Sequence, residues 1–288
     1  MTPPRNKNLN KEIILCVSVI VMKSLLALSF ASIFCATILP LQAIPSWASQ
    51  LTNAKPGAHP AITPQKLLYQ LSWRGQVQAG VVEFYFGSKG TTPQVLQATC
   101  EGKSLGIAAG LFPYRFDMQG KIQRSNLAPL LMHCNETDAE ETQVTTVTYK
   151  PGKVDVTEIS RPHSTGKDTT DNKTFSYAPV FDAFSSMLFI RSQPLNQGDR
   201  IVQVIHPFKT PYLAKIEVLG RENINGQAAI KMSIELTKIT SSLALKPYKK
   251  MKTATLWISD DTHRIPLEMR VAAFIGDVRM TLQKQEVL

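Results

Sequence analysis

The stretch 114–122 reads Tyr114-Arg115-Phe116-Asp117-Met118-Gln119-Gly120-Lys121-Ile122, in which apolar and polar side chains alternate. Successive side chains of a β-strand point to opposite faces of a sheet, so this stretch predicts a strand with one dry and one wet face. The same alternation returns at 228–237, 265–273 and 278–282. One-sided strands are typical of antiparallel sheets, because parallel sheets are usually covered on both faces.

Turn signals separate these runs at hairpin spacing, among them Arg74-Gly75, Pro151-Gly152 and Asn225-Gly226. We therefore predict a mainly β fold of about twelve to fourteen strands, arranged as an antiparallel curved sheet or an incomplete β-barrel. The polar segment Ser160–Lys173 does not alternate, and we expect it to be a loop.

Residues 179–194 break the strand pattern and predict one helix. Asp182 can cap a helix over Ala183–Arg191, in which Phe184 and Leu188 share one apolar stripe, and Pro194 stops it. We expect this helix to pack on the curved sheet and to join its halves, 65–175 and 195–288. A single β-rich domain over 65–288 needs fewer assumptions than two domains.

The N-terminal segment has the features of an export signal. Read from Met22, a short positive region is followed by the apolar run Leu25–Leu39, whose 15 residues are fewer than the roughly 20 of a spanning helix. We therefore predict a signal segment over 1–48, with Met22 as an alternative true start, then a flexible lead-in over 49–64. The predicted location is the periplasm; an uncleaved N-terminal anchor is the alternative.

Two of the four cysteines, Cys100 and Cys134, lie outside this leader. An even number of cysteines in an oxidising compartment favours a disulfide, and we predict that these two pair. Two buried free thiols are the alternative.

Composition and net charge limit the kinds of molecule that the protein could bind. The 288 residues are 43% hydrophobic and 19% charged, which argues against disorder, and the formal net charge is +10. Export argues against nucleic acid as the partner of this charge. The densest part is the cluster Lys246, Lys249, Lys250 and Lys252, which is either a solvated loop or a patch attracted to anionic lipid head groups or cell-wall polymer.

Signatures of catalysis and of cofactor binding are missing from the sequence: it has no nucleophile elbow, zinc-binding His-Glu-x-x-His, phosphate loop or dinucleotide fingerprint. We expect no catalytic residue, no metal and no cofactor. Asp182, Ser185 and His206 are the only triad that we can assemble, and a helix cap explains Asp182 better. Asp260-Asp261 indicates a hairpin turn rather than a calcium site, since no third acid is near in sequence.

Aromatic side chains on the predicted strands and helix have two readings. They are core residues if the sheet interior is filled, whereas a curved and partly filled sheet would turn them into the lining of an apolar cavity, the usual form of a small-ligand site. The predicted groove residues are Trp73, Phe84, Phe86, Tyr114, Phe116, Phe184 and Leu188.

Three stretches together resemble a known family. They are Leu68–Gly75 followed by Ala79-Gly80; Asp182–Leu188 with Pro194 and Gly198; and a turn motif, Leu256-Trp257-Ile258-Ser259-Asp260-Asp261 running into Arg264-Ile265-Pro266. Over about 65–285 the chain is similar to the exported bacterial proteins grouped as domain of unknown function 3108. The resemblance implies a β-rich domain in a Gram-negative periplasm or envelope and brings no established activity.

These features favour a non-catalytic periplasmic binding module whose apolar groove holds a lipid, an acyl chain or a hydrophobic peptide. A structural or assembly factor, contacting envelope proteins through a sheet edge or the lysine cluster, is one alternative. A hydrolase acting on envelope polymer or lipid is the other.

Overall fold

The computed structural model describes residues 44–53, 55–58, 63–87, 91–248, 251–273 and 276–288. Most of the predicted export signal, residues 1–43, lies outside this range. None of the helices in the described part of the chain combines the length and apolar character that a membrane span needs.

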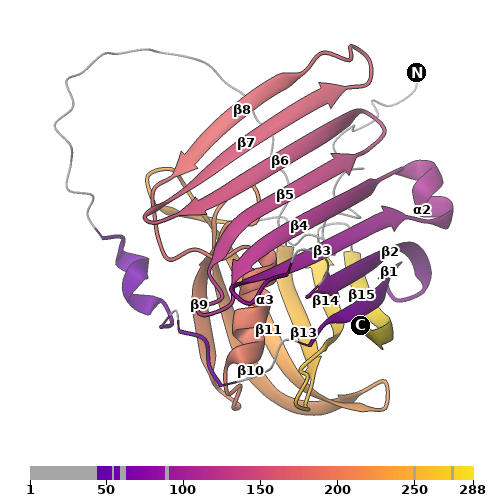
Figure 1. Ribbon diagram of the computed structural model, residues 1–288. Coiled ribbons are helices and arrows are strands. Elements are labelled where there is room, and N and C mark those ends of the chain that lie inside the picture. Colours follow the sequence, from indigo (N-terminus) through magenta and orange to yellow (C-terminus); the bar gives the residue numbers. More distant parts are fainter. Residues whose placement is uncertain (1–43, 54, 59–62, 88–90, 249–250, 274–275) are drawn as a thin grey trace.

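Within the described residues, fifteen strands form one sheet in which every pairing between strands is antiparallel (Figure 1). They are β1 (Gln65–Trp73), β2 (Val77–Phe86), β3 (Val95–Ser104), β4 (Arg115–Gln123), β5 (Pro129–Thr137), β6 (Glu141–Lys150), β7 (Lys153–Pro162), β8 (Thr169–Phe175), β9 (Arg200–Ile205), β10 (Tyr212–Ile224), β11 (Gln227–Ile239), β12 (Leu245–Pro247), β13 (Met251–Ser259), β14 (Pro266–Ala273) and β15 (Gly276–Val287). The same part of the chain contains three short helices: η1 (Ser46–Gln50), α2 (Gly106–Leu111) and α3 (Ala183–Ser192).

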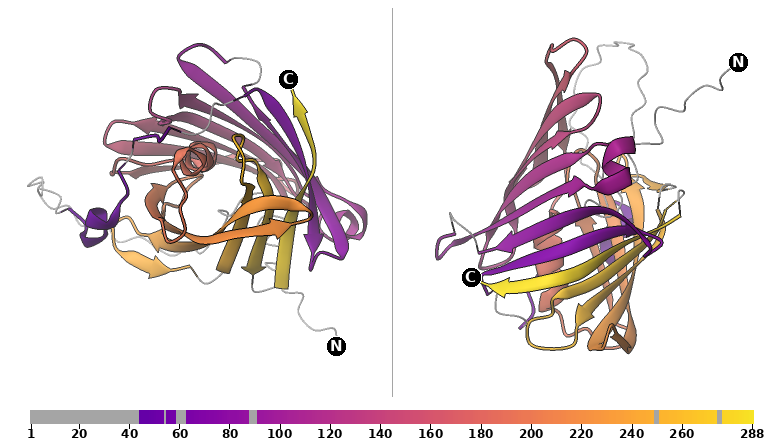
Figure 2. Two further views of the ribbon diagram at one scale, coloured as in Figure 1. Left: turned by 90° about the horizontal axis from the view of Figure 1, so that it is seen from below. Right: turned by 90° about the vertical axis from the view of Figure 1, so that its right-hand side faces the viewer.

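The first and last strands in the sequence, β1 and β15, pair with each other in the middle of the sheet. The strand order is β8-β7-β6-β5-β4-β3-β2-β1-β15-β14-β13-β11-β10-β9, with β12 beside β11. Hence β1–β8 and β9–β15 are two halves of one sheet, joined through the β1–β15 pair. The sheet curls around α3, which lies on its concave side (Figure 2, left). The predicted open, curved antiparallel sheet with one packed helix is confirmed.

The one-sided character of the strands is also confirmed. Along β4 burial alternates at every position, with Phe116, Met118 and Ile122 buried and their neighbours exposed. Because the buried set faces the concave side, where α3 packs, the sheet has one dry face and one largely wet face.

The two edges of the sheet are protected differently. Other segments cover the β9 edge: Thr52 N–H donates to Val202 O (2.9 Å), and Phe181 N–H donates to Val204 O (2.9 Å). At the opposite edge, β7 and β8 include the two ends of the segment Ser160–Lys173, so the predicted loop is confined to residues 163–168 and is wrong for the rest of the segment. From Thr169 to Thr174 every residue of β8 is exposed, so this edge strand has no dry face to produce an alternation.

The segment before β1 contributes to the core. The Trp47 side chain is 2% exposed, its Nε1–H donates to Leu243 O (2.8 Å), and its ring lies 4.8 Å from that of Tyr177. Cleavage at the predicted leader boundary after residue 48 would remove this buried side chain.

Cys100 and Cys134 are buried and are not joined by a disulfide, so the predicted disulfide is wrong. Cys100 in β3 and Cys134 in β5 are both paired with Met118 of the intervening strand β4. Two strand spacings separate their backbones by about 9.5 Å, whereas a disulfide needs Cα atoms within about 7 Å of each other.

Candidate functional site

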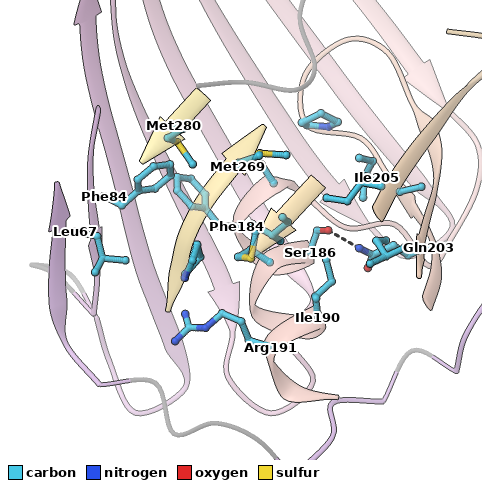
Figure 3. Close-up of a pocket in the computed structure, with 18 of the residues that line it drawn as sticks. Leu67, Phe84, Phe184, Ser186, Ile190, Arg191, Gln203, Ile205, Met269 and Met280 are labelled. Carbon is cyan, nitrogen blue, oxygen red and sulfur yellow. Dashed lines mark hydrogen bonds between the residues drawn. The ribbon is translucent and has the colours of Figure 1, made fainter. Parts of the chain in front are cut away.

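An apolar cavity of about 160 Å³ lies between α3 and the concave face of the sheet (Figure 3). Strands from both halves contribute to it, and most of its lining is aliphatic, aromatic or methionine. The lining residues are Leu67, Tyr69, Phe84, Phe86, Met118, Ala183, Phe184, Ser186, Met187, Ile190, Arg191, Gln203, Ile205, Pro207, Ala214, Ile216, Ile234, Leu236, Leu256, Pro266, Met269 and Met280.

The start of α3 is fixed by a capping box. Asp182 Oδ1 accepts from Ser185 N–H (2.6 Å), and Ser185 Oγ accepts from Asp182 N–H (2.9 Å). This satisfies two amides that would otherwise be unpaired in a buried helix terminus. Asp182 is thus a helix cap, as the sequence indicated.

The helix approaches the sheet closely at Gly120 in β4. A Cβ atom at this position would lie 2.6 Å from Cδ2 of Phe184, so the aromatic ring occupies the space that a side chain would take. The same ring makes edge-to-face contacts with Phe84 (centroids 6.5 Å apart) and Phe86 (6.2 Å). Phe184 therefore anchors α3 to the first half of the sheet.

Four methionines, Met118, Met187, Met269 and Met280, line the cavity. Their unbranched side chains have three rotatable bonds and can fill or vacate irregular space at low cost. The cavity volume is similar to that of an engineered apolar cavity of about 150 Å³ that admits benzene in another protein. The lining thus combines existing space with side chains able to enlarge it.

Three polar side chains interrupt the apolar lining. Gln203 Nε2 donates to Ser186 Oγ, while Gln203 Oε1 has no hydrogen-bond partner among the described residues. The third is Arg191, in the last turn of α3, which is 1% exposed.

The Arg191 guanidinium is only partly hydrogen-bonded. Its Nη2 donates to His263 O (2.7 Å), whereas Nε and Nη1 have no partner within the described part of the chain. The group lies 6.0 Å from the centroid of Phe86. Burial lowers the pKa of Arg191 to about 10, so the side chain still carries its positive charge at neutral pH.

The family-motif turn between β13 and β14 holds the end of α3. Asp261 Oδ1 accepts from His263 N–H (2.8 Å) and Arg264 N–H (2.9 Å), which closes the turn. The Arg264 side chain then donates to the carbonyl oxygens of Arg191 and Gln193. Turn and helix are thus joined in both directions, since Arg191 donates back to His263.

The other marker residues of this motif lie around the same turn. Asp260 pairs with Arg221 (Nε to Oδ2, 2.8 Å), and Pro266 O accepts from the Tyr69 hydroxyl (2.8 Å). Trp257 faces the outer side of the sheet, where its Nε1–H donates to Glu222 (2.7 Å). No group of three or more potential metal ligands occurs among the described residues, the Asp260-Asp261 pair included.

The structure brings three of the seven predicted groove residues, Phe84, Phe86 and Phe184, to the cavity. Leu188 is buried in the core outside the cavity lining, and Tyr114 and Phe116 pack on each other with ring centroids 6.0 Å apart.

Trp73 is 43% exposed, because a register shift between Leu71 and Ser72 turns the end of β1 over. The functional candidates that the sequence did not indicate are Ser186, Gln203 and Arg191. An arginine in the last helical turn is common for electrostatic reasons alone.

Asp182, Ser185 and His206 have structural partners. The Ser185 hydroxyl is engaged by the backbone of Asp182, and the His206 ring packs against Phe175 (centroids 5.4 Å apart). Burial raises the pKa of Asp182 to about 6 and lowers the pKa of His206 to about 4. Both side chains are thus destabilised in their charged forms.

The lysine cluster is only partly described. Lys246 is exposed in β12 and lines a polar groove of about 670 Å³ with Lys173 and Lys209. Lys249, Lys250 and the side chain of Lys252 lie outside the described residues. Lys209 is paired with Glu158, and Lys173 with Asp171 (2.6 Å), so part of the positive charge at this groove is neutralised within the sheet.

Comparison with known proteins gives a family and several structural neighbours. The profile of the proteins of unknown function DUF3108 matches residues 68–283. A β-barrel-like DUF1849 protein from Brucella abortus is 7% identical, with a TM-score of 0.49 over 79% of this chain and 98% of that chain. The lipoprotein LppX of Mycobacterium tuberculosis is 12% identical, with a TM-score of 0.22 over 79% of this chain and 91% of that chain. No curated protein sequence matches the chain.

Proposed function

The chain belongs to the DUF3108 family of proteins of unknown function, and from this premise we propose that it is an exported, non-catalytic module that binds an apolar ligand under α3. The ligand is a lipid, an acyl chain or a hydrophobic peptide. The leader-like N-terminal sequence supports export to the periplasm.

The observation that carries this proposal is the apolar cavity itself. Its lining comes from both halves of one sheet and from the helix between them, so the whole fold contributes to enclosing it. Small-ligand sites are typically concave and apolar with a few placed polar groups, which is the composition of this cavity. Its methionines supply the adaptability that a ligand larger than the present space requires.

An assembly factor acting through a sheet edge receives less support. Thr52 and Phe181 occupy the β9 edge, and the β8 edge carries Asp171 and Lys173, charged residues of the kind that discourage strand addition.

A cavity-filling substitution tests the proposal. Ala214 of β10 is buried and lines the cavity, so Ala214→Leu places new side-chain volume where the ligand would lie. The matched control is Ala228→Leu, at an exposed position on β11. Binding is measured by displacement of a fluorescent fatty acid, and circular dichroism checks that each variant is folded.

The wild type and Ala228→Leu should bind the probe, while Ala214→Leu should bind it at least about tenfold more weakly, an effect of the size expected from steric exclusion. Absence of probe binding by the wild type, or equal binding by the two variants, would contradict the proposed site.

A further inference from the structure

Arg191 introduces a full positive charge into a cavity that is otherwise nearly apolar. The side chain is 1% exposed and makes no ion pair in the described parts of the chain. Two of its three guanidinium nitrogens, Nε and Nη1, have no hydrogen-bond partner there. Buried charges in proteins are normally paired and fully hydrogen-bonded, because leaving one unpaired is costly.

The groups around Arg191 do not neutralise it. The Tyr69 hydroxyl donates a hydrogen bond to Pro266 O, and Arg264 is a second cation. Asp261 is a carboxylate with an electrostatic influence on Arg191, but its Oδ1 already accepts from Ser259, His263 and Arg264. The unused donors of Arg191 are therefore available for an anion that enters the cavity.

Building on the apolar-ligand function proposed above, we propose that Arg191 binds the carboxylate of a single-chain fatty acid whose hydrocarbon chain lies in the cavity. The carboxylate oxygens accept from Nε and Nη1, the two donors left open by the protein. The chain then runs past Phe84, Phe184 and Met269, which Figure 3 places around the same space as Arg191.

Charge and volume both favour this class of ligand. One arginine balances one negative charge, which suits a carboxylate better than a phosphate monoester carrying about −1.5 to −2. A cavity of about 160 Å³ accommodates roughly six carbons without rearrangement, by comparison with the benzene-binding cavity of similar size. Movement of Met118, Met269 and Met280 would admit a longer chain.

A head-group series separates the role of Arg191 from apolar binding in general. Octanoate and octanol have the same chain length and differ in charge, and their affinities are measured by calorimetry on the exported protein. Hydrogen bonds to a charged group predict that the wild type binds octanoate about 10- to 100-fold more tightly than octanol.

Arg191→Met keeps an unbranched apolar side chain, shorter than that of arginine, and removes the charge, so the ratio of the two affinities should fall to about 1 while octanol binding persists. Lys215→Met, at an exposed position of β10, is the matched control and should keep the wild-type ratio. Arg191→Lys should keep a preference for octanoate. If the methionine variant does not fold, Arg191→Gln replaces it, because glutamine also lacks the charge and should likewise lower the ratio to about 1.

The outcomes distinguish the two proposals. Equal affinities for octanoate and octanol in the wild type, or an unchanged ratio in Arg191→Met, would overturn the assignment of Arg191 and leave apolar binding intact. Binding of neither compound by the wild type would overturn both.

Discussion

The contact between Gly120 and Phe184 predicts a specific cost for adding one methyl group to β4. In Gly120→Ala the new Cβ atom would lie 2.6 Å from Cδ2 and 3.1 Å from Cε2 of Phe184, so the helix or the ring has to move. Overpacking of this kind costs about 1–3 kcal/mol. Alanine has less conformational entropy than glycine in the unfolded chain, and this offsets about 0.5–1 kcal/mol of the cost. The net loss is up to about 2.5 kcal/mol, and its midpoint of about 1 kcal/mol corresponds to a fall in Tm of about 2–4 °C for a domain of this size.

Thermal denaturation followed by circular dichroism measures this effect. Gly110→Ala is the matched control, because no atom beyond its chain neighbours and the backbone of its own helix lies within 4 Å of the added Cβ, and it should leave Tm unchanged or slightly raise it. Replacing the aromatic ring by a smaller side chain in Phe184→Leu should relieve the clash, so Gly120→Ala should destabilise the protein less in that background. The same cost in both backgrounds, or none in the wild type, would refute the close packing of α3 on β4.

Three further predictions concern buried groups. Burial raises the pKa of Asp182 from 3.8 to about 6, so between these pH values the native state binds more protons than the unfolded state, and the wild type loses stability as the pH rises. The free energy of unfolding of Asp182→Asn, measured by urea titration, should therefore rise by up to about 3 kcal/mol relative to that of the wild type between pH 4 and pH 7. A difference between the two proteins that does not change with pH would contradict this. Thiol titration of a chain that starts at Ile44 should detect Cys100 and Cys134 only after unfolding; fewer than two thiols would show a disulfide. Trp47→Ala should cost about 3–5 kcal/mol, unlike Trp73→Ala at its half-exposed position; equal costs would place Trp47 outside the core.

The sheet could be predicted because its strands are one-sided. In 114–122 the alternation directly reports which residues face the core, and β4 has that pattern of burial. The β8 strand escaped detection because both of its faces are wet, so edge pairing alone makes it a strand. An alternating pattern predicts which side of a strand is buried, and a strand with no buried side has no such pattern.

The cavity could be predicted only in outline. Phe84 and Phe86 have the same parity on β2 and reach the cavity together, whereas the register shift after Leu71 sends Trp73 to the surface. The distance between Cys100 and Cys134 depends on strand order, which no local pattern encodes. The role of Arg191 depends on what its side chain does not contact, and that is a property of the folded molecule.

Native mass spectrometry of the protein purified from the bacterial envelope without detergent tests the central claim most directly. We expect a bound species that is released on activation and has the mass of a molecule with one hydrocarbon chain, and its occupancy should fall in Ala214→Leu. If the purified wild type carries no bound species, so that its mass differs from that of Ala214→Leu only by the substitution, the account is contradicted.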